Sequence, residues 1–251
     1  MTETPLPAGQ SEDALLGGRV RLRQPVAGYR AAIDPVFLAA AVPAVPGDRA
    51  LDVGCGAGAA ALCLAIRVPD CRVTGIERER ELVRLANDNV VLNNLAGRVS
   101  MMAGDLLAPP PRLEPGVFDH VLANPPHLAA GTATPPPDPA RAAAHVESGA
   151  DLAAWLRFAL VMARPKGTIT VIHRADRLDA ILAELTGRAG EIVVFPLWPG
   201  AGKPAKRVII RARKNVATPT RLAAGLILHE PDGRYTVAAD AVLREGAGLC
   251  L

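Results

Sequence analysis

A short apolar strand that runs into a glycine-rich turn constrains this chain more than any other feature. The stretch is Leu51-Asp52-Val53-Gly54-Cys55-Gly56-Ala57-Gly58, and an alanine-rich apolar segment follows it at once. The glycines remove side chains where a backbone must turn or approach a ligand, and the alanine-rich segment favours a helix. A helix that begins at such a turn directs unpaired N–H groups toward polar or anionic ligand groups. The sequence therefore predicts a nucleotide-type binding site here.

The spacing of these glycines bears on the class of cofactor. The common dinucleotide fingerprint is G-x-G-x-x-G, whereas this turn reads G-x-G-x-G and has Asp52 two residues before Gly54. The next predicted strand ends at Glu77, a carboxylate placed to accept both hydroxyls of an adenosine ribose. Glu77 would suit NAD or any other cofactor that contains an adenosine ribose. The glycine spacing, however, disfavours an NAD-dependent oxidoreductase.

Two further polar motifs follow apolar, strand-like runs. Gly104-Asp105-Leu106 follows residues 99–103, and Asn124-Pro125-Pro126-His127 follows residues 117–123. Open parallel sheets place ligand contacts at the carboxyl ends of their strands. In this order, the glycine turn, Glu77 and these two motifs resemble S-adenosylmethionine-dependent methyltransferases that act on a planar amino group. One departure is His127, where that family usually has Tyr, Phe or Trp.

The flanking sequences narrow the resemblance within that superfamily. They are similar to the bacterial methyltransferases that make N6-methyladenine beside the anticodon of a valine tRNA. The similar flanks are Tyr29-Arg30-Ala31-Ala32-Ile33-Asp34-Pro35, Ala86-Asn87-Asp88-Asn89, Asn93-Asn94-Leu95 and Pro196-Leu197-Trp198-Pro199 to Lys206-Arg207. The resemblance covers roughly residues 17–240. It implies a Rossmann-like, class I methyltransferase fold, S-adenosyl-L-methionine as cofactor, and RNA, most of all tRNA, as partner.

Hydrophobic periodicity and turn signals predict an alternation of strands and helices. The predicted strands cover residues 50–53, 71–76, 99–103, 117–123, 168–173, 191–195 and 206–213, and the predicted helices residues 35–42, 59–67, 79–95, 151–163 and 176–186. Asp34 is predicted to cap the first helix, with Pro35 at its first position. The last two strands have no helix between them. This predicts an α/β fold with a seven-stranded, mostly parallel, doubly wound sheet whose last strand is antiparallel.

Length and composition favour one domain. The chain has 251 residues, 50% of them hydrophobic, which is enough to bury a full core. Residues 1–16 are predicted as a flexible tail, and residues 17–251 as a single methyltransferase domain. This domain includes a small C-terminal appendage from about residue 217, where Pro231-Asp232-Gly233 indicates a hairpin.

Cysteine usage and hydropathy bear on metal binding and location. The four cysteines lack paired ligand or disulfide spacing, which predicts reduced structural thiols and no metal site. No apolar run reaches membrane-spanning length, and the amino terminus lacks the pattern of a secretory signal. The sequence therefore predicts a cytoplasmic protein that does not associate with a membrane.

The motif Asn124-Pro125-Pro126-His127 is the candidate catalytic site. The exocyclic nitrogen of adenine is a poor nucleophile because its lone pair is delocalised into the ring. The Asn124 side-chain oxygen and the Pro125 carbonyl could each accept one N–H and leave the lone pair aimed at the methyl donor. Pro125 and Pro126 would hold that carbonyl rigid, and His127 would stack on the flipped base. The alternative is an ordinary proline turn at the end of a strand.

The candidate cofactor contacts are acidic, glycine and amide residues around the same strand ends. They are Asp52, Gly54, Gly56, Gly58, Glu77, Asp105 and Asn124. Asp105 could accept the exocyclic amine of the cofactor adenine, or it could simply cap the turn that follows it.

The charge balance permits RNA as a partner without requiring it. Lys and Arg number 28 against 25 Asp and Glu, a net charge of +3. Lys203, Lys206 and Arg207 cluster near the last predicted strand, where they could contact phosphates or could form a solvated face. Residues 17–26 alternate arginines with apolar residues, which predicts a strand whose basic face meets either phosphates or solvent.

The predicted function is methyl transfer from S-adenosylmethionine to an exocyclic amino group of a nucleobase, with adenine N6 in tRNA favoured. The same tetrapeptide would also suit guanine N2 in rRNA or a glutamine side chain in a protein. A catalytically silent RNA-binding protein is an alternative of another class, suggested by His127.

Overall fold

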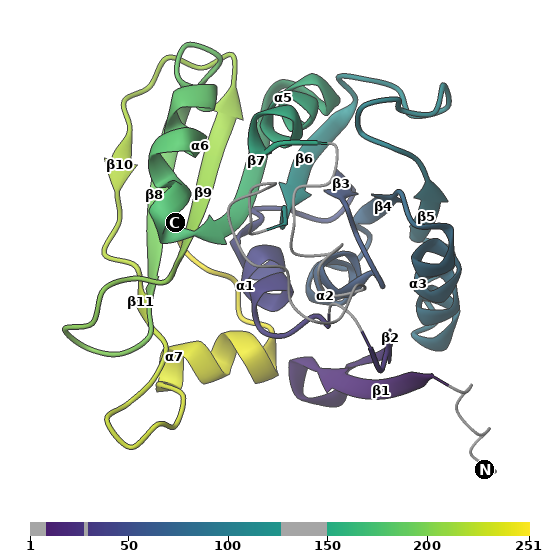
Figure 1. The fold of residues 1–251 in the computed structure, drawn as a ribbon, viewed down its shortest axis with the longest axis horizontal. Helices are drawn as coiled ribbons and strands as arrows, with labels where there is room; N and C mark the ends of the chain where they lie inside the picture. The colour runs from purple at the N-terminus through teal and green to yellow at the C-terminus, as the bar shows by residue number, and fades with distance from the viewer. Residues whose placement is uncertain (1–8, 28–29, 127–149) are drawn as a thin grey trace.

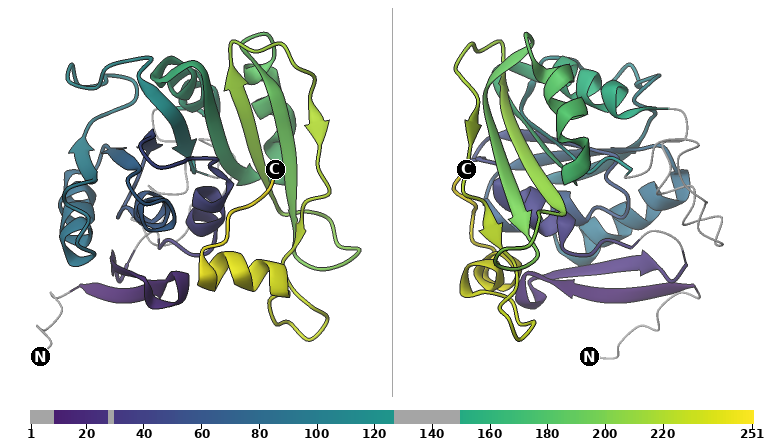
Figure 2. Two further views of the ribbon diagram at one scale, coloured as in Figure 1. Left: turned by 180° about the vertical axis from the view of Figure 1, so that it is seen from behind. Right: turned by 60° about the vertical axis from the view of Figure 1, so that its left-hand side comes forward.

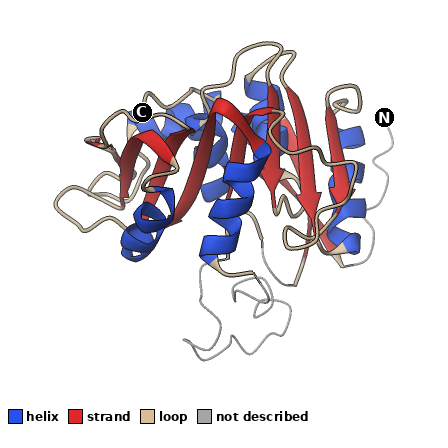
Figure 3. Ribbon diagram, turned by 90° about the horizontal axis from the view of Figure 1, so that it is seen from above, coloured by secondary structure: helices blue, strands red, loops and turns tan. Residues whose placement is uncertain are grey.

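The protein is built on a mixed β-sheet with helices on both faces (Figures 1 and 3). The structure is a computed structural model and describes residues 9–27, 30–126 and 150–251. The strands of the main sheet are, in chain order, β3 (Arg49–Val53), β4 (Arg72–Glu77), β5 (Val99–Ala103), β6 (Phe118–Ala123), β7 (Ala163–Arg174), β8 (Ala189–Trp198), β9 (Arg207–Lys214), β10 (Arg221–Leu222) and β11 (Leu226–Ile227).

The order of these strands confirms the predicted topology. The sheet runs β10-β8-β9-β7-β6-β3-β4-β5, and β11 also pairs with β8. Strand β9 is antiparallel to β7 and β8, and the other neighbouring strands are parallel. The seven predicted strands, β3 to β9, therefore form the doubly wound sheet expected of them. The short strands β10 and β11 extend it to nine strands among the described residues, two more than predicted.

The helices form one layer on each face of the sheet (Figure 3). One layer contains α1 (Asp34–Ala41), α2 (Ala59–Arg67) and α3 (Arg80–Leu92), and the other contains α5 (Leu152–Met162) and α6 (Leu178–Leu185), which follows the 3-10 turn η2 (Ala175–Arg177). Alternate residues of β3 pack against the two helix layers, because successive side chains of a strand point to opposite faces. Ala50 packs on the α1–α3 side, whereas Leu51 and Val53 pack on the α5–α6 side.

An N-terminal hairpin lies beside the α1–α3 layer (Figure 2). It consists of β1 (Gln10–Leu15), the 3-10 turn η1 (Leu16–Gly18) and β2 (Val20–Pro25). The prediction of a flexible tail over residues 1–16 is therefore wrong for residues 10–16. The polar sequence of β1 resembles a tail, yet its Glu12 accepts hydrogen bonds from Arg21 at 2.6 Å and Arg23 at 3.3 Å across the hairpin. The arginine-bearing face of β2 is thus paired within the protein.

Two local predictions differ from the structure. Asp34 is the first residue of α1 rather than its cap, and its carboxylate accepts from Nε of Arg207 at 2.8 Å. Residues 164–167, which separate the predicted helix 151–163 from the predicted strand 168–173, form a bulge inside β7, which already pairs with β6 at Ala163 and resumes regular pairing at Thr168. Lys166 has a positive φ of 63°, which allows the extra residues to loop out of the ladder.

The C-terminal appendage contains a short helical segment beside the N-terminal hairpin (Figures 1 and 2). The predicted hairpin is reduced to one bridge, between His229 and Tyr235, around the expected turn. The chain then forms α7 (Val237–Asp240) and the π-helical turn η3 (Ala241–Glu245). In the described part of the chain, no helix combines the length and apolarity needed to span a membrane.

Candidate active site

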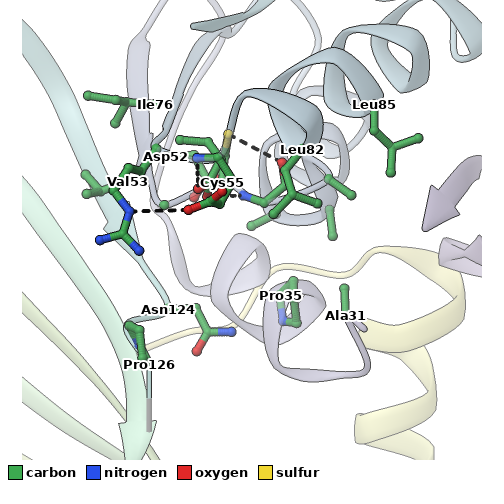
Figure 4. Close-up of a pocket in the computed structure, with 18 of the residues that line it drawn as sticks. Ala31, Pro35, Asp52, Val53, Cys55, Ile76, Leu82, Leu85, Asn124 and Pro126 are labelled. Carbon is green, nitrogen blue, oxygen red and sulfur yellow. Dashed lines mark hydrogen bonds and ion pairs between the residues drawn. The ribbon is translucent and has the colours of Figure 1, made fainter. Parts of the chain in front are cut away.

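A cavity of about 630 Å³ opens at the carboxyl ends of β3, β4, β5 and β6 (Figure 4). This volume lies within the usual range of about 300–1,000 Å³ for small-molecule sites. Among the predicted site residues, the cavity is lined by Asp52, Gly54, Gly56, Glu77, Asp105, Asn124, Pro125 and Pro126. The structure therefore brings together side chains from four strand ends that lie far apart in the sequence.

Two predicted residues do not take part in this lining. Gly58 is the N-cap residue of α2, with φ of 92°, and it does not appear among the described residues that line the cavity. Its glycine identity has a backbone reason, because L side chains rarely adopt a φ of 92°. His127 lies outside the described residues, so its stacking role stays a prediction.

The glycine turn is held against the end of β4 by its own backbone. The N–H groups of Gly54 and Cys55 both donate to the Ile76 carbonyl, at 2.8 and 3.1 Å. Gly54 has φ of 66°, and a Cβ at this position would lie 2.3 Å from Cη2 of Trp155. Both the backbone conformation and the aromatic ring of α5 therefore require glycine at this position.

The Glu77 carboxylate is oriented by two backbone N–H groups. Its Oε2 accepts from Gly56 at 3.1 Å, and its Oε1 accepts from Glu79 at 2.9 Å. Each carboxylate oxygen can accept a second hydrogen bond, so the group still has capacity for ligand hydroxyls. Glu77 thus ties the glycine turn to the end of β4 and presents a fixed acceptor to the cavity.

Asp52 is buried beneath the glycine turn and also lines the cavity. Its side chain is on the α2 side of β3, and its Oδ2 accepts from the N–H of Ala61 in the first turn of α2 at 3.1 Å. The pKa of this carboxyl is raised to about 7, mainly by burial; the hydrogen bond from Ala61 opposes this shift, and the nearby Glu77 charge adds to it. Near neutral pH the group is therefore close to half ionised.

We expect the affinity for a positively charged ligand in this cavity to rise with pH because of Asp52. Such a ligand favours the ionised carboxylate, so below a pH of about 7 its binding must expel a proton. The folding stability of the unliganded protein depends on pH in the opposite direction. The pKa of Asp52 in the folded protein exceeds the ordinary value of 3.8, so the stability that Asp52 contributes is lost as pH rises toward 7. Calorimetric titration with S-adenosylmethionine between about pH 6 and pH 8 measures the affinity profile. The side chain of the Asp52→Asn variant cannot titrate, so its affinity should change less with pH. Equal slopes of affinity against pH in both proteins would show that Asp52 does not cause the pH dependence.

Asp105 both lines the cavity and caps a turn. Its Oδ1 accepts from the N–H of Leu107 at 2.9 Å, and its carbonyl accepts from the N–H of Ala108 at 3.0 Å. Asp105 therefore caps the turn that follows it, as the alternative interpretation predicted. The hydrogen bond from Leu107 leaves other lone pairs of the carboxylate available, so the contact to a cofactor adenine stays a prediction.

The Asn124-Pro125-Pro126 segment is fixed at the end of β6 by a histidine of the neighbouring strand. Nε2 of His173, on β7, lies 3.2 Å from the Pro126 carbonyl oxygen, and His173 is completely buried. In Figure 4, Asn124 and Pro126 lie together at one side of the cavity, with Pro35 of α1 facing them. The segment therefore has a defined backbone position beside the glycine turn and Glu77.

Several lining residues escaped the sequence prediction. Trp155, on α5, closes the cavity behind Gly54, and Gln24 and Pro25 belong to the N-terminal hairpin. His173 lies behind the Asn-Pro-Pro segment. Trp155 offered a signal, since it is one of only two tryptophans in the chain. The hairpin and His173 offered none, because their roles depend on neighbours that are distant in the sequence.

Comparisons with known proteins agree with this arrangement. The family model described as methyltransferase small domain matches residues 33–136. The tRNA1(Val) (adenine(37)-N6)-methyltransferase of Aeromonas hydrophila is 28% identical over 206 residues, covering 81% of this chain and 84% of that protein. The protein of the same name from Yersinia pestis is 28% identical over 206 residues, covering 81% of each.

Solved structures are similar over most of the chain. A predicted O-methyltransferase from Agrobacterium tumefaciens has a TM-score of 0.71 at 25% identity, covering 86% of this chain and 98% of its own. The geranyl diphosphate C-methyltransferase of Streptomyces coelicolor, solved with S-adenosyl-L-homocysteine, has a TM-score of 0.52 at 13% identity, covering 72% of this chain and 78% of its own. The second likeness concerns the fold alone.

A doubly wound sheet with an antiparallel β9, and a cavity at the carboxyl ends of its parallel strands, are typical of a class I methyltransferase. With the family model and the relatives in agreement, the chain is an S-adenosylmethionine-dependent methyltransferase. Within this class, it is similar over four fifths of its length to the bacterial tRNA1(Val) (adenine(37)-N6)-methyltransferases.

Proposed function

We propose that this enzyme methylates an exocyclic amino group of a nucleobase, adenine N6 in tRNA. The observation that carries the proposal is the Asn124-Pro125-Pro126 segment at the end of β6, in the same cavity as the glycine turn and Glu77. The names of the relatives, which are adenine-N6 methyltransferases of a tRNA, support the same substrate.

In this proposal Glu77 and Asp105 bind the nucleoside part of the cofactor. Glu77 would accept the ribose hydroxyls, since its two backbone bonds fix the carboxylate and leave further acceptor capacity. Asp105 would accept the adenine amine from the neighbouring strand end. Asp52 and the glycine turn would surround the remaining part of the molecule. S-adenosylmethionine bound there supplies an electrophilic methyl group.

The chain's own contribution to the chemistry is to orient the acceptor nitrogen. The Asn124 side-chain oxygen and the Pro125 carbonyl would each accept one N–H of the amino group, which favours a pyramidal nitrogen. The contact between His173 and the Pro126 carbonyl fixes the backbone of this segment before the substrate arrives. The amino proton becomes acidic only after methyl transfer, so no general base is needed beforehand. His127 would stack on the base.

The loop between β8 and β9 is proposed to bind RNA phosphates. Strand β8 is parallel to β7 in direction, so residues 199–206 leave the sheet at the same edge as the cavity. The loop is also tied to the end of β7, because the N–H of Ala175 donates to the Lys206 carbonyl at 3.1 Å. Lys203 and Lys206 are exposed there. Arg207 lies beside them but is paired with Asp34, so we assign phosphate binding to the two lysines.

Replacing both Lys203 and Lys206 with alanine should flatten the salt dependence of RNA binding. Each single-strand phosphate contact contributes about 0.7 to the logarithmic slope, so the loss should be about 1.4. Fluorescence titrations of tRNA binding at several salt concentrations measure the slope. Arg72→Ala, at an exposed position on the opposite edge of the sheet, serves as the control and should leave it unchanged. An unchanged slope in the lysine variant would restore the solvated-face interpretation.

The substrate is tested by incubating the enzyme and labelled S-adenosylmethionine with total RNA and, in a parallel reaction, with total protein, both from a strain that lacks the gene. Nucleoside analysis should find the label in N6-methyladenine of a tRNA. Label in N2-methylguanine of rRNA, or in a glutamine of a protein, would replace the proposed substrate. RNA binding without transfer of label would identify a silent RNA-binding protein instead.

A further inference from the structure

Two asparagines complete the free edge of the N-terminal hairpin, Asn89 within α3 and Asn93 at the C-cap of this helix. Asn93 accepts from the N–H of Arg21 at 2.8 Å and donates to its carbonyl at 2.7 Å. Asn89 does the same with Arg23, at 2.8 and 2.9 Å. Four residues of a helix advance about 6 Å, and two residues of a strand advance about 6.8 Å, so the amides meet alternate residues of β2. The two side chains therefore act as a substitute for a third strand.

The two asparagines differ in their second bond, because Nδ2 of Asn93 donates to the Asn89 carbonyl at 2.7 Å, whereas Asn89 reaches the glycine turn. Nδ2 of Asn89 also donates to the carbonyl of Ala57 at 2.9 Å, and Ala57 belongs to the glycine turn that lines the cavity. Asn89 is completely buried, and both of its donor hydrogens are used. One side chain thus joins the hairpin to the cofactor turn by three hydrogen bonds.

The hairpin itself forms one wall of the cavity. Gly9, Gln10, Gln24 and Pro25 line it, and Gln24 is 2% exposed. Oε1 of Gln24 accepts from the N–H of Ala31 at 2.6 Å, while its Nε2 donates to Asp13 at 2.9 Å. The bond from Ala31 fixes the hairpin to the segment that leads into α1, and the bond to Asp13 joins β2 to β1. Any movement of the hairpin would therefore change the shape of the cofactor site.

The far end of the hairpin is supported by the C-terminal appendage. Leu16 of η1 is 2% exposed, and a Cβ on Gly17 would lie 2.8 Å from the carbonyl oxygen of Arg244 in η3. On the other side, a Cβ on Gly246 would lie 2.6 Å from a guanidinium nitrogen of Arg19. The appendage therefore closes against the turn of the hairpin, at the end away from the cavity.

We propose that Asn89 is a positioning residue that couples the N-terminal hairpin to the cofactor-binding glycine turn. Binding at the turn then stabilises the docked hairpin, and a docked hairpin raises the affinity for the cofactor. The two effects are equal in size because a coupling between two equilibria is reciprocal. This inference rests on the cavity being the cofactor site, but not on the identity of the methylated substrate.

The wild-type protein tests the coupling directly through amide hydrogen exchange, with and without S-adenosyl-L-homocysteine. The informative amides are those of Leu22 and Gln24, which alternate with Arg21 and Arg23 and face β1. Without ligand, these amides are expected to exchange faster than the amides of β3, which shows that their exchange reports local opening of the hairpin and not global unfolding. Saturating ligand should slow them at least about fivefold. Binding without such slowing would overturn the inference, whereas no binding would overturn the site assignment beneath it.

The variants Asn89→Ala and Asn93→Ala separate coupling from simple support of the hairpin. Both lose the paired bonds to β2, but only the Asn89 variant loses the contact to Ala57. Asn89→Ala should bind S-adenosyl-L-homocysteine at least about fivefold more weakly and should lose most of the ligand-dependent slowing. Asn93→Ala should keep both within about twofold. Equal effects in the two variants would reduce Asn89 to a structural residue. If Asn89→Ala does not fold, Asn89→Ser and the wild-type exchange measurement still decide the question.

Discussion

Asn124→Ala is expected to lower the turnover number by about a hundred- to a thousandfold while cofactor affinity stays nearly unchanged. This is the usual size of the loss when one fixed hydrogen-bonding group at the reacting centre is removed. The Asn124 oxygen would hold the amino group in its reactive geometry, so the interaction counts mainly in the transition state. Single-turnover methylation at saturating RNA, together with calorimetry of S-adenosylmethionine binding, measures the two quantities separately.

Asn124→Asp provides a matched comparison for this experiment. Aspartate has nearly the same shape and keeps an acceptor oxygen, so it should retain more activity than alanine at this position. A turnover number within a few fold of wild type in Asn124→Ala would contradict the proposed orientation of the amino group. A parallel loss of cofactor affinity would instead place Asn124 among the cofactor contacts.

Glu77→Ala should weaken S-adenosylmethionine binding by about ten- to a hundredfold. A hydrogen bond to a charged group contributes about 1.5–3 kcal/mol, which corresponds to this change in affinity. The structure adds a second cause, because the carboxylate also binds the N–H groups of Gly56 and Glu79. The substitution removes a ligand contact and a support of the glycine turn together.

The variant Asp88→Ala controls for the loss of negative charge. Asp88 is exposed on α3 and does not line the cavity in the described structure, so its removal should leave affinity within about twofold of wild type. Glu77→Gln keeps the size of the side chain and one acceptor oxygen, and its affinity should fall between those of wild type and Glu77→Ala. Unchanged calorimetric affinity in Glu77→Ala would remove this residue from the site.

The strands and helices of the main sheet were predictable because their signals are local. Helix α2 and strand β5 match their predicted bounds, since apolar runs are flanked by Gly58 and Pro69 in one case and by Gly97 and Gly104 in the other. The candidate site followed from the same information. Glu77, Asp105 and Asn124 stand directly after apolar strands, and a parallel sheet brings such positions to one edge.

The errors concern residues whose structure depends on distant partners. Residues 10–15 resemble a polar tail until Glu12 is seen against Arg21 and Arg23. Asp34 has the sequence context of a helix cap, and Arg207 that of a phosphate contact, yet the two pair with each other across 173 positions of the chain. Neither pairing has a local signal, because opposite charges are common in any sequence.

The sequence by itself determined the order of strands and helices, the sheet edge at which the site forms and the acidic, amide and glycine residues gathered there. These depend on periodicity and on short motifs, which act over a few residues. Only the tertiary structure decided that the amino-terminal hairpin walls the cavity and that Asn89 joins this hairpin to the glycine turn. It also placed His173 behind the Asn-Pro-Pro segment. Side-chain amides, imidazoles and carboxylates can bond to any backbone within reach, so their partners are settled only once the chain has folded.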